Sequence, residues 1–288
     1  MNKKSCLLSV DVEDWFHLIG VGLDYQFNKP TGGIDSWENR EQRVDYTTRW
    51  ILDLFDEFEV RSTFFILGWV AERYPELVLE IHNRGHEIAS HSHWHRLVYQ
   101  LTPDEFRADL RRSIDVLEDA CGAQVYGFRA STASIVDWAI DIIAEEGLVY
   151  DSSLFPAMYH DVYGKLSNVD DTKAIEKLPN GLWEVKFSSM RFAGKSIPWS
   201  GGGYFRILPY PLFKLGANRI LRQHDMFQFY IHPWELDENP PMLDSLKLPY
   251  KLRRYTGISK MPTRMRRLLK DFSFKPVIDL VREQDEAI

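Results

Sequence analysis

The sequence is poor in cysteine, and it lacks both a long apolar run and an excess of positive charge. Cys6 and Cys121 are its two cysteines, too few for a disulfide scaffold, and they favour buried thiols in a reducing compartment. Residues 1–4 lead into a brief apolar segment that soon meets acidic residues, so we expect neither a signal peptide nor a membrane-spanning helix. The formal net charge of −7 disfavours nucleic acid as a partner. These absences together predict a cytoplasmic protein.

The composition is otherwise that of a folded protein, with 44% hydrophobic and 27% charged residues over 288 positions. That length suits one large α/β domain or two small ones. Apolar segments of strand length alternate with segments of helical period, and no internal repeat or low-complexity linker interrupts them. The alternation predicts a parallel sheet with helical crossovers. We expect strands at 5–10, 61–67, 87–89, 125–128, 148–150, 182–187 and 226–231, and helices at 43–58, 71–84, 134–147, 209–222 and from Pro103 onward.

Short local signals predict several helix ends and loops. Thr102, followed by Pro103 and Glu105, indicates a capping box. Gly85 is expected to end a helix, and Ser134 to cap the start of another. Residues 18–40 lack any periodicity and should form a long loop, and the glycines at 201–203 should form another.

Three histidines follow one of the expected strands, in the run His91-Ser92-His93-Trp94-His95. His91 and His95 stand four apart, so a helical turn would put both imidazoles on one face and direct His93 away from them. Imidazole is a common ligand of zinc and related metals, but a metal site needs a further ligand, typically a carboxylate. A polar surface turn is the alternative interpretation of the same residues.

Unusual polar residues follow the ends of several different strands. They are Asp11 to Asp14, His91 to His95, Arg129, Asp151 and His232. In barrels and open α/β sheets, active sites are built at the carboxyl edge of the strands. Polar residues of ordinary loops would instead be scattered over both edges. The sequence therefore predicts a metal-dependent active site at this edge.

These residues resemble the motifs of the NodB-type polysaccharide deacetylases, carbohydrate esterase family four. His91 to His95 is similar to the family's H-[ST]-x-x-H metal motif, Asp11 to Asp14 to its aspartate motif, Phe128-Arg129 to its arginine motif, and Phe229 to His232 to its final motif. The segments 11–17, 201–206 and 232–236 look like those of an exopolysaccharide branch found beside exosortase systems. The resemblance implies an incomplete (β/α) barrel, and it covers nearly the whole chain. We therefore expect one domain over 1–288, with 251–288 a basic helical C-terminal extension.

The resemblance also implies roles for these residues. A divalent metal, first of all Zn²⁺ with Co²⁺, Ni²⁺, Mn²⁺ or Fe²⁺ as alternatives, would be held by His91, His95 and one carboxylate. Strand alternation puts Glu13 on the same side as Asp11, whereas a bend after the strand could present Asp14, so both stay candidates for that carboxylate.

The catalytic residues implied by the same resemblance are Asp11, His232 and Arg129. Asp11 would be the general base and Arg129 would pair with it. His232 would protonate the departing amine.

Further residues are candidates for the walls of a sugar site. Trp199, Tyr204 and Trp234 could stack on pyranose rings, and His17 could line the pocket, although buried packing is an equally good interpretation of these residues. Asp151 could orient His232, although its Asp-Ser-Ser context is also an ordinary turn.

The predicted function is removal of N-acetyl groups, with release of acetate, from an N-acetylated polysaccharide, oligosaccharide or lipid-linked precursor. The alternatives are another linear amide hydrolase on the same fold and a metal-free carbohydrate-binding assembly protein. The basic segment 251–272 carries Met265, Leu268, Leu269 and Phe272 at helical spacing. Such a helix could contact the cytoplasmic face of a membrane, but packing of its apolar stripe on the domain is the simpler expectation. The sequence carries no signal for the oligomeric state.

Overall fold

The computed structural model describes residues 4–17, 34–156, 163–170, 172–192, 195–242 and 248–285. Most of the loop expected at 18–40 lies outside this part. The described strands are β1 Ser5–Val12, β2 Thr63–Ile66, β3 Glu87–Ser90, β4 Gly127–Phe128, β5 Tyr150–Asp151, β6 Ile175–Lys177, β7 Trp183–Val185, β8 Ser189–Phe192, β9 Lys195–Pro198, β10 Met226–Ile231 and β11 Phe274–Lys275. The described α-helices are α1 Val44–Glu57, α2 Gly68–Arg73, α3 Pro75–Asn83, α4 Pro103–Cys121, α5 Asp137–Glu145, α6 Gly202–Ile207, α7 Tyr210–His224, α8 Leu248–Tyr255, α9 Met261–Asp271 and α10 Val277–Gln284.

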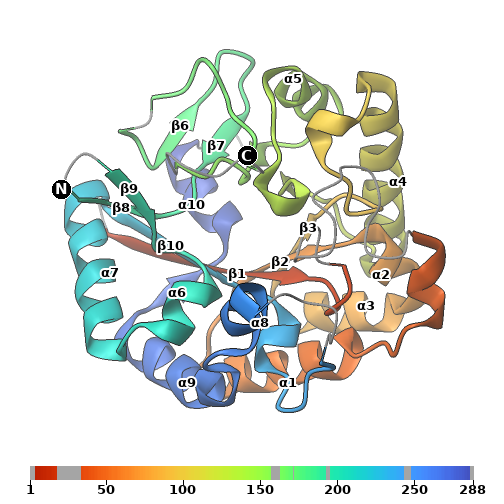
Figure 1. The fold of residues 1–288 in the computed structure, drawn as a ribbon. Helices are drawn as coiled ribbons and strands as arrows, with labels where there is room; N and C mark the ends of the chain where they lie inside the picture. Colours follow the sequence, from red (N-terminus) through yellow and green to blue (C-terminus); the bar gives the residue numbers. More distant parts are fainter. Residues whose placement is uncertain are drawn as a thin grey trace.

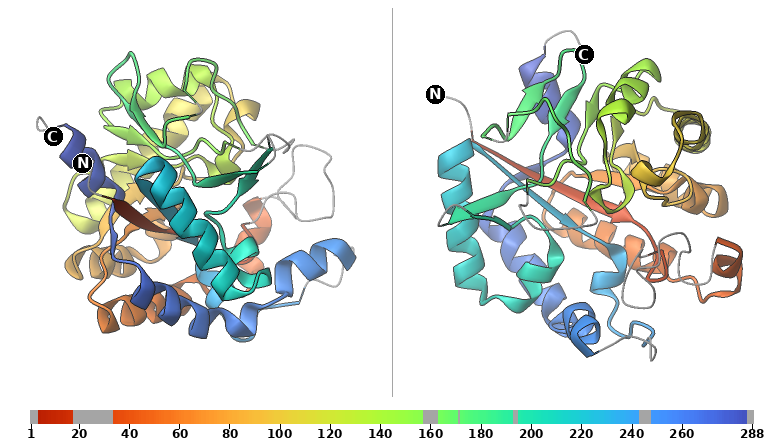
Figure 2. Two further views of the ribbon diagram at one scale, coloured as in Figure 1. Left: turned by 90° about the vertical axis from the view of Figure 1, so that its left-hand side faces the viewer. Right: turned by 45° about the horizontal axis from the view of Figure 1, so that its top comes forward.

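Nine of the described strands form the main sheet, in the order β10-β1-β2-β3-β4-β5-β7-β6 with β11 also paired to β1, and β8 and β9 form a separate antiparallel pair. Within the main sheet every neighbouring pair is parallel except β6 with β7. The sheet curls into a half-barrel with helices on its outside, and β1 lies beside β10, which ends the strand order (Figures 1 and 2). The expected α/β fold of the incomplete-barrel type is confirmed.

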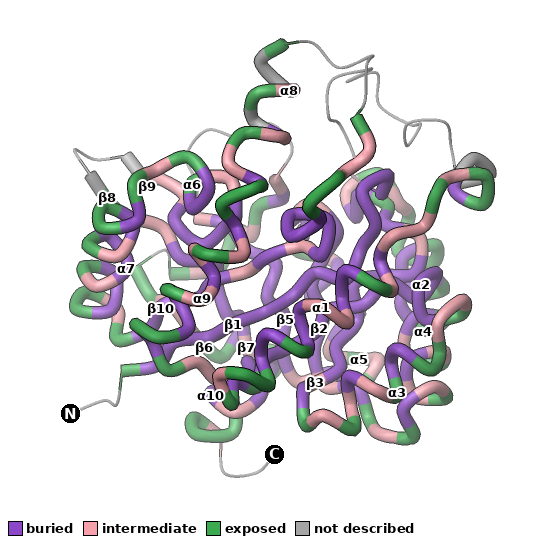
Figure 3. The backbone as a smooth tube through the Cα atoms, turned by 90° about the horizontal axis from the view of Figure 1, so that it is seen from below, coloured by how far each residue is buried: buried purple, intermediate pink, exposed green. Residues whose placement is uncertain are grey.

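Burial explains why β1 forms where its apolar run predicts. All eight of its residues are buried, because the strand has neighbours along its length and side chains packed on both faces. The helices are amphipathic instead, and α1 turns Val44, Ile51, Leu54 and Phe55 inward. Figure 3 shows the difference, with buried strands inside helices that alternate between buried and exposed residues.

Some of the helix ends predicted from local signals are confirmed, and others are wrong. Thr102 forms the predicted capping box with Glu105 at the start of α4, and Gly85 has a φ of 81° after α3. The helix expected at 71–84 is two helices, α2 and α3, because Pro75 lacks an N–H and begins a new helix. Ser134 does not cap α5, which begins at Asp137. Its hydroxyl donates to the Ser131 carbonyl and accepts the Val98 N–H, so it fixes a loop instead.

The last part of the chain packs against the half-barrel. Met265, Leu268 and Leu269 of α9 are buried in the main core, so the apolar stripe expected there covers the domain, and Phe272 follows it into the same core. The glycine run is not a plain loop, because α6 begins at Gly202. Among the described helices, none has the length and apolar character needed to cross a bilayer.

Candidate metal centre and active site

The register of the sheet gathers the predicted site residues at one edge. Val10 is level with Ile231 of β10, and Ile66 of β2 is level with Ser90 of β3. Ser90 is in turn level with Phe128 of β4. The residues that follow these positions therefore leave neighbouring strands at the same, carboxyl edge. They include Asp11 and Glu13 from β1, His91 after β3, Arg129 after β4 and His232 after β10.

Glu13, His91 and His95 form a compact cluster. One potential ligand atom from each lies within 4.8 Å of the others, and all three side chains are buried. The segment that carries the histidines is not helical, which corrects our expectation of a helical turn, since Ser92 and His95 have φ values of 67° and 50°. The two rings still approach each other, with centroids 5.3 Å apart, because this sharply bent segment turns both of them inward.

His93 points away from this cluster, as expected, although for a different reason. Its backbone N–H donates to Asp109 Oδ2 on α4, at 2.7 Å. Its ring is fully buried and packs so close to Gly68 of α2 that a Cβ there would lie 2.3 Å from His93 Nδ1. The bent segment thus directs His93 into the core, and His91 and His95 toward the carboxyl edge of the sheet.

The three side chains of the cluster fit a metal. His91 Nδ1 lies 2.8 Å from the backbone oxygen of Arg129, which can only accept, so Nδ1 carries the proton and Nε2 keeps a lone pair. Burial lowers the pKa of His91 to about 4, so the ring is neutral at pH 7. Burial alone would raise the pKa of Glu13, but His95, His232 and His91 together hold it far below its usual value. Two imidazoles and one carboxylate suit zinc and similar divalent metals and leave room for water or substrate.

Asp14 is engaged elsewhere, at the start of α1. Its Oδ1 accepts the Trp15 N–H at 2.8 Å, and its Oδ2 accepts the N–H groups of Arg43 and Val44 at 2.6 and 3.0 Å. Burial raises the pKa of Asp14 to about 6, against the lowering effect of these hydrogen bonds. Of the two carboxylates that the sequence left open, the geometry therefore favours Glu13 as the third ligand.

Arg129 forms an ion pair with Asp11. Its Nη1 lies 2.6 Å from Asp11 Oδ1 and also donates to the hydroxyl of Ser9. Its Nε donates to the carbonyl oxygen of Ser152, and the guanidinium packs over the Phe65 ring at 3.9 Å. Because Arg129 is fixed on several sides and 1% exposed, it sets the position of the Asp11 carboxylate.

His232 contacts the cluster through Glu13. Its Nε2 lies 3.1 Å from Glu13 Oε1, and its Nδ1 lies 2.8 Å from Glu235 Oε1. Burial lowers the pKa of His232, although Glu13 and Asp11 act in the opposite direction.

Asp151 does not orient His232, contrary to our suggestion from the sequence. Its carboxylate accepts from the Ser153 hydroxyl at 2.6 Å and from the Ser153 N–H, and it also interacts with Glu184. The contact between Glu235 and His232 was not predicted from the sequence. The signal that could have found it is the position of Glu235, three residues after the histidine that follows β10.

The proposed sugar-binding residues lie in different surroundings. Trp199 is 5% exposed and donates through Nε1 to the Phe213 carbonyl of α7, like a core residue. Tyr204 is 42% exposed on α6, and Trp234 stacks on His232. His17 is buried against other aromatic rings, and its Nδ1 accepts the Asp14 N–H at 2.9 Å.

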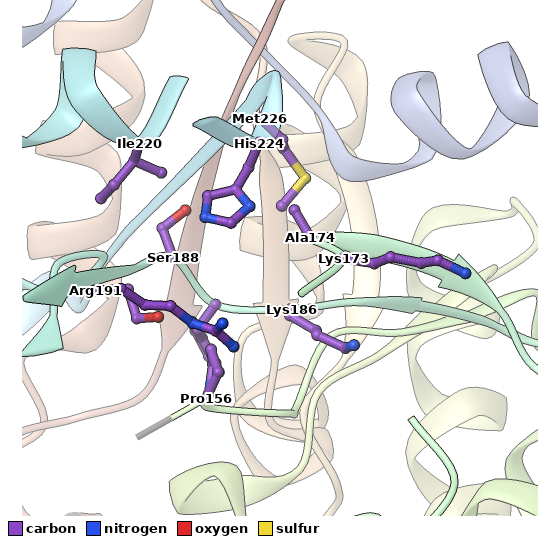
Figure 4. A pocket seen from close by; sticks show the side chains of 11 residues that line it. Pro156, Lys173, Ala174, Lys186, Ser188, Arg191, Ile220, His224 and Met226 are labelled. Carbon is purple, nitrogen blue, oxygen red and sulfur yellow. The ribbon is translucent and has the colours of Figure 1, made fainter. Parts of the chain in front are cut away.

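A small cleft lies elsewhere, beside the start of β10 (Figure 4). Its lining includes Lys173, Lys186, Arg191, His224 and Met226. None of the cluster residues lines it. It is therefore separate from the candidate metal centre.

Fold and site together define a half-barrel α/β protein with a buried Glu–His–His cluster at the carboxyl edge of its sheet. Residues 40–150 match the family model described as polysaccharide deacetylase, and residues 152–282 match a domain of unknown function, DUF3473. The chain thus contains a polysaccharide deacetylase domain of the NodB type, carbohydrate esterase family four.

Several curated proteins are similar to part of the chain. A peptidoglycan-N-acetylglucosamine deacetylase of Bacillus cereus is 27% identical over 124 residues, which is 38% of this chain and 45% of that protein. Chitin deacetylase 1 of Cryptococcus neoformans is 30% identical over 98 residues, 34% of this chain and 21% of that protein. The chain therefore spans less than half the length of these relatives.

Solved structures share the fold over almost the whole chain. A protein of Mycobacterium smegmatis, provisionally named a polysaccharide deacetylase, superposes with a TM-score of 0.61 at 20% identity, covering 99% of this chain and 92% of that one. A pseudoenzyme of carbohydrate esterase family four from Bacillus anthracis superposes with a TM-score of 0.50 at 15% identity, covering 97% and 66%. At these identities the likeness establishes the fold alone.

Proposed function

We propose that the protein is a metal-dependent hydrolase that removes N-acetyl groups from N-acetylhexosamine units. The observation that carries this proposal is the buried Glu13–His91–His95 cluster, together with the Asp11–Arg129 ion pair and the contact of His232 with Glu13 at the same edge of the sheet. A pseudoenzyme can keep this fold, as the Bacillus anthracis protein shows, so the argument depends on the side chains and not on the scaffold.

The chemistry follows from what these side chains can do. Glu13, His91 and His95 would hold a divalent metal, with zinc the first candidate, and its Lewis acidity would polarise the acetamide carbonyl and lower the pKa of water. Asp11, fixed by Arg129, takes a proton from the attacking water. His232 gives a proton to the amine as the C–N bond breaks, because an unprotonated amine is a poor leaving group. The products are acetate and a sugar amine.

The substrate class is proposed from the relatives. Those reported above are named for deacetylation of peptidoglycan and of chitin, which are both polymers of N-acetylated sugars. The resemblance to the exopolysaccharide branch narrows the proposal to an exopolysaccharide or its lipid-linked precursor. Trp234, which stacks on His232, and Tyr204, which is 42% exposed on α6, are proposed to contact the sugar.

We also propose that residues 1–288 act as one domain in the cytoplasm. β1 pairs with β10, so strands from both halves of the chain share one sheet and supply one cluster of side chains. The free, buried Cys6 and Cys121 agree with a reducing compartment. Fractionation of cells that make the full-length protein would test this location.

The function is tested by acetate release from N-acetylglucosamine oligomers, with and without a chelator, beside His91→Ala. Bound metal is measured separately by elemental analysis, so that metal binding has a readout that does not depend on activity. Loss of both metal and acetate release in His91→Ala, and normal behaviour of His82→Ala on α3, would support the proposal. Stoichiometric metal without acetate release would favour another amide substrate, and absence of bound metal would favour a carbohydrate-binding protein.

A further inference from the structure

The imidazole of His232 has one partner at Nδ1 and another on a face of the ring. Its Nδ1 lies 2.8 Å from Glu235 Oε1, and the same oxygen accepts the His232 backbone N–H at 3.2 Å. The Trp234 ring stacks on the imidazole, with centroids 5.5 Å apart and planes 26° apart. The ring edge that remains, at Nε2, faces Glu13. His232 can therefore exchange a proton with substrate only through Nε2.

Glu235 is in turn fixed by α6, which comes from a distant part of the chain. Arg206 forms an ion pair with Glu235, and both side chains are almost fully buried. The first residue of α6, Gly202, lies so close that a Cβ there would be 1.9 Å from Glu235 Oε2. The next residue, Gly203, has nothing within 4 Å of the equivalent position. Gly202 is thus a place where only glycine lets the Glu235 carboxylate stay where it is.

We propose that Glu235, balanced by Arg206 and seated against Gly202, is the positioning residue for the general acid His232. This inference rests on the proposed function. A carboxylate at Nδ1 keeps the proton of that nitrogen in place, so the second proton of the ring is carried on Nε2. As the acetamide C–N bond breaks, that Nε2 proton passes to the nitrogen of the departing amine, and the Nδ1 hydrogen bond to Glu235 persists. Arg206 makes the buried carboxylate tolerable, since an unpaired buried charge is costly.

A structural explanation competes with this one, because Glu235 also accepts the His232 N–H and so shapes the short 3-10 helix at Pro233–Leu236. The two explanations differ in how the effect depends on the leaving group. An amine must be protonated to leave, whereas the phenolate of 4-nitrophenyl acetate leaves without a proton. Loss of a positioning residue should therefore slow the amide reaction much more than the ester reaction. Distortion of the site should slow both alike.

The experiment measures kcat and KM of the metal-loaded enzyme on N-acetylglucosamine oligomers and on 4-nitrophenyl acetate. For Glu235→Ala we expect kcat on the amide to fall about 100-fold, the lower end of what general acid catalysis contributes. Glu235→Gln keeps an acceptor oxygen but no charge, and should lie between Glu235→Ala and the wild type. The KM on the amide and the bound metal should stay unchanged. The ester rate should change less than about threefold if no general acid acts in that reaction.

Two pairs of variants separate the positioning explanation from the structural one. In the first pair, Gly202→Ala should reproduce the selective loss of the amide rate, and Gly203→Ala should not. In the second pair, Glu87→Gln is the control for Glu235→Gln: it removes a carboxyl at the start of β3, on the opposite edge of the sheet, and should leave the amide and ester rates unchanged.

Equal losses on amide and ester in Glu235→Ala, or an unchanged amide rate, would overturn the positioning role of Glu235. A wild-type enzyme that releases acetate from neither probe would contradict the proposed function instead, before any variant is made.

Discussion

Replacing each of two adjacent carboxylates in a separate variant tests whether Glu13 and Asp14 have the different roles that their contacts indicate. Glu13 lies with His91 and His95, whereas Asp14 accepts backbone N–H groups from Trp15, Arg43 and Val44. Glu13→Gln should keep the fold and weaken metal binding by at least about 100-fold, the upper end of what loss of an outer partner of a metal ligand costs. Asp14→Ala should keep the metal and weaken the fold.

The expected size of the Asp14→Ala effect follows from two opposing terms. Three N–H groups lose their acceptor, at about 2 kcal/mol each, which amounts to about 6 kcal/mol. The substitution also removes a buried charge, and a pKa raised from 3.8 to about 6 corresponds to a cost of about 3 kcal/mol at pH 7. The difference predicts a free energy of unfolding lower by about 3 kcal/mol, or a Tm lower by about 6–12 °C.

Denaturant unfolding of the metal-free proteins gives the free energy, and elemental analysis after dialysis against zinc gives the metal content. The reasoning would be refuted if Asp14→Ala lost its metal with its stability intact. Stoichiometric, tight metal binding by Glu13→Gln would likewise contradict the role of Glu13 as a metal ligand.

Three further predictions concern other parts of the molecule. Burial raises the pKa of Glu87 to about 7 from 4.5, so the folded state holds more protons than the unfolded state between these values. Stability to urea should therefore fall as the pH rises from about 4.5 to 7, and Glu87→Gln should flatten this dependence. Gly216→Ala should lower the Tm by several degrees, because its Cβ would lie 2.3 Å from the Trp199 ring; an unchanged Tm in a thermal melt would contradict this packing. Arg129→Lys should keep the metal but lower kcat at least about tenfold, because a lysine cannot reproduce the contacts with both Asp11 and Ser152; wild-type kcat would show that the guanidinium geometry does not matter.

The sequence predicted the parts of the fold that depend on local pattern. Buried strands such as β1 and β10 have continuous apolar runs, and α1 has a clear apolar stripe. The short strands β6, β8 and β9 were missed, because a run of three or four residues is too short to show a readable period.

The site was predictable to the extent that its residues follow strand ends. Asp11, Arg129 and His232 were expected at one edge, and the register of the sheet brings them there. The choice between Glu13 and Asp14 was not predictable, because it depends on where the start of α1 lies in space. The same holds for Arg206, whose contact with Glu235 joins residues far apart in the sequence.

The pairing of β1 with β10 has a consequence for how the chain must fold during synthesis. Ser5 is level with Met226, so about 220 residues must leave the ribosome before β1 gains this neighbour, a contact of very high sequence separation. Until then β1 presents an open apolar edge, which is a hazard for aggregation. A fragment ending near residue 150, where the two family matches meet, would also separate β5 from β7 and lack His232. Expression of such halves should therefore give insoluble material, and reassembly would need both halves present together.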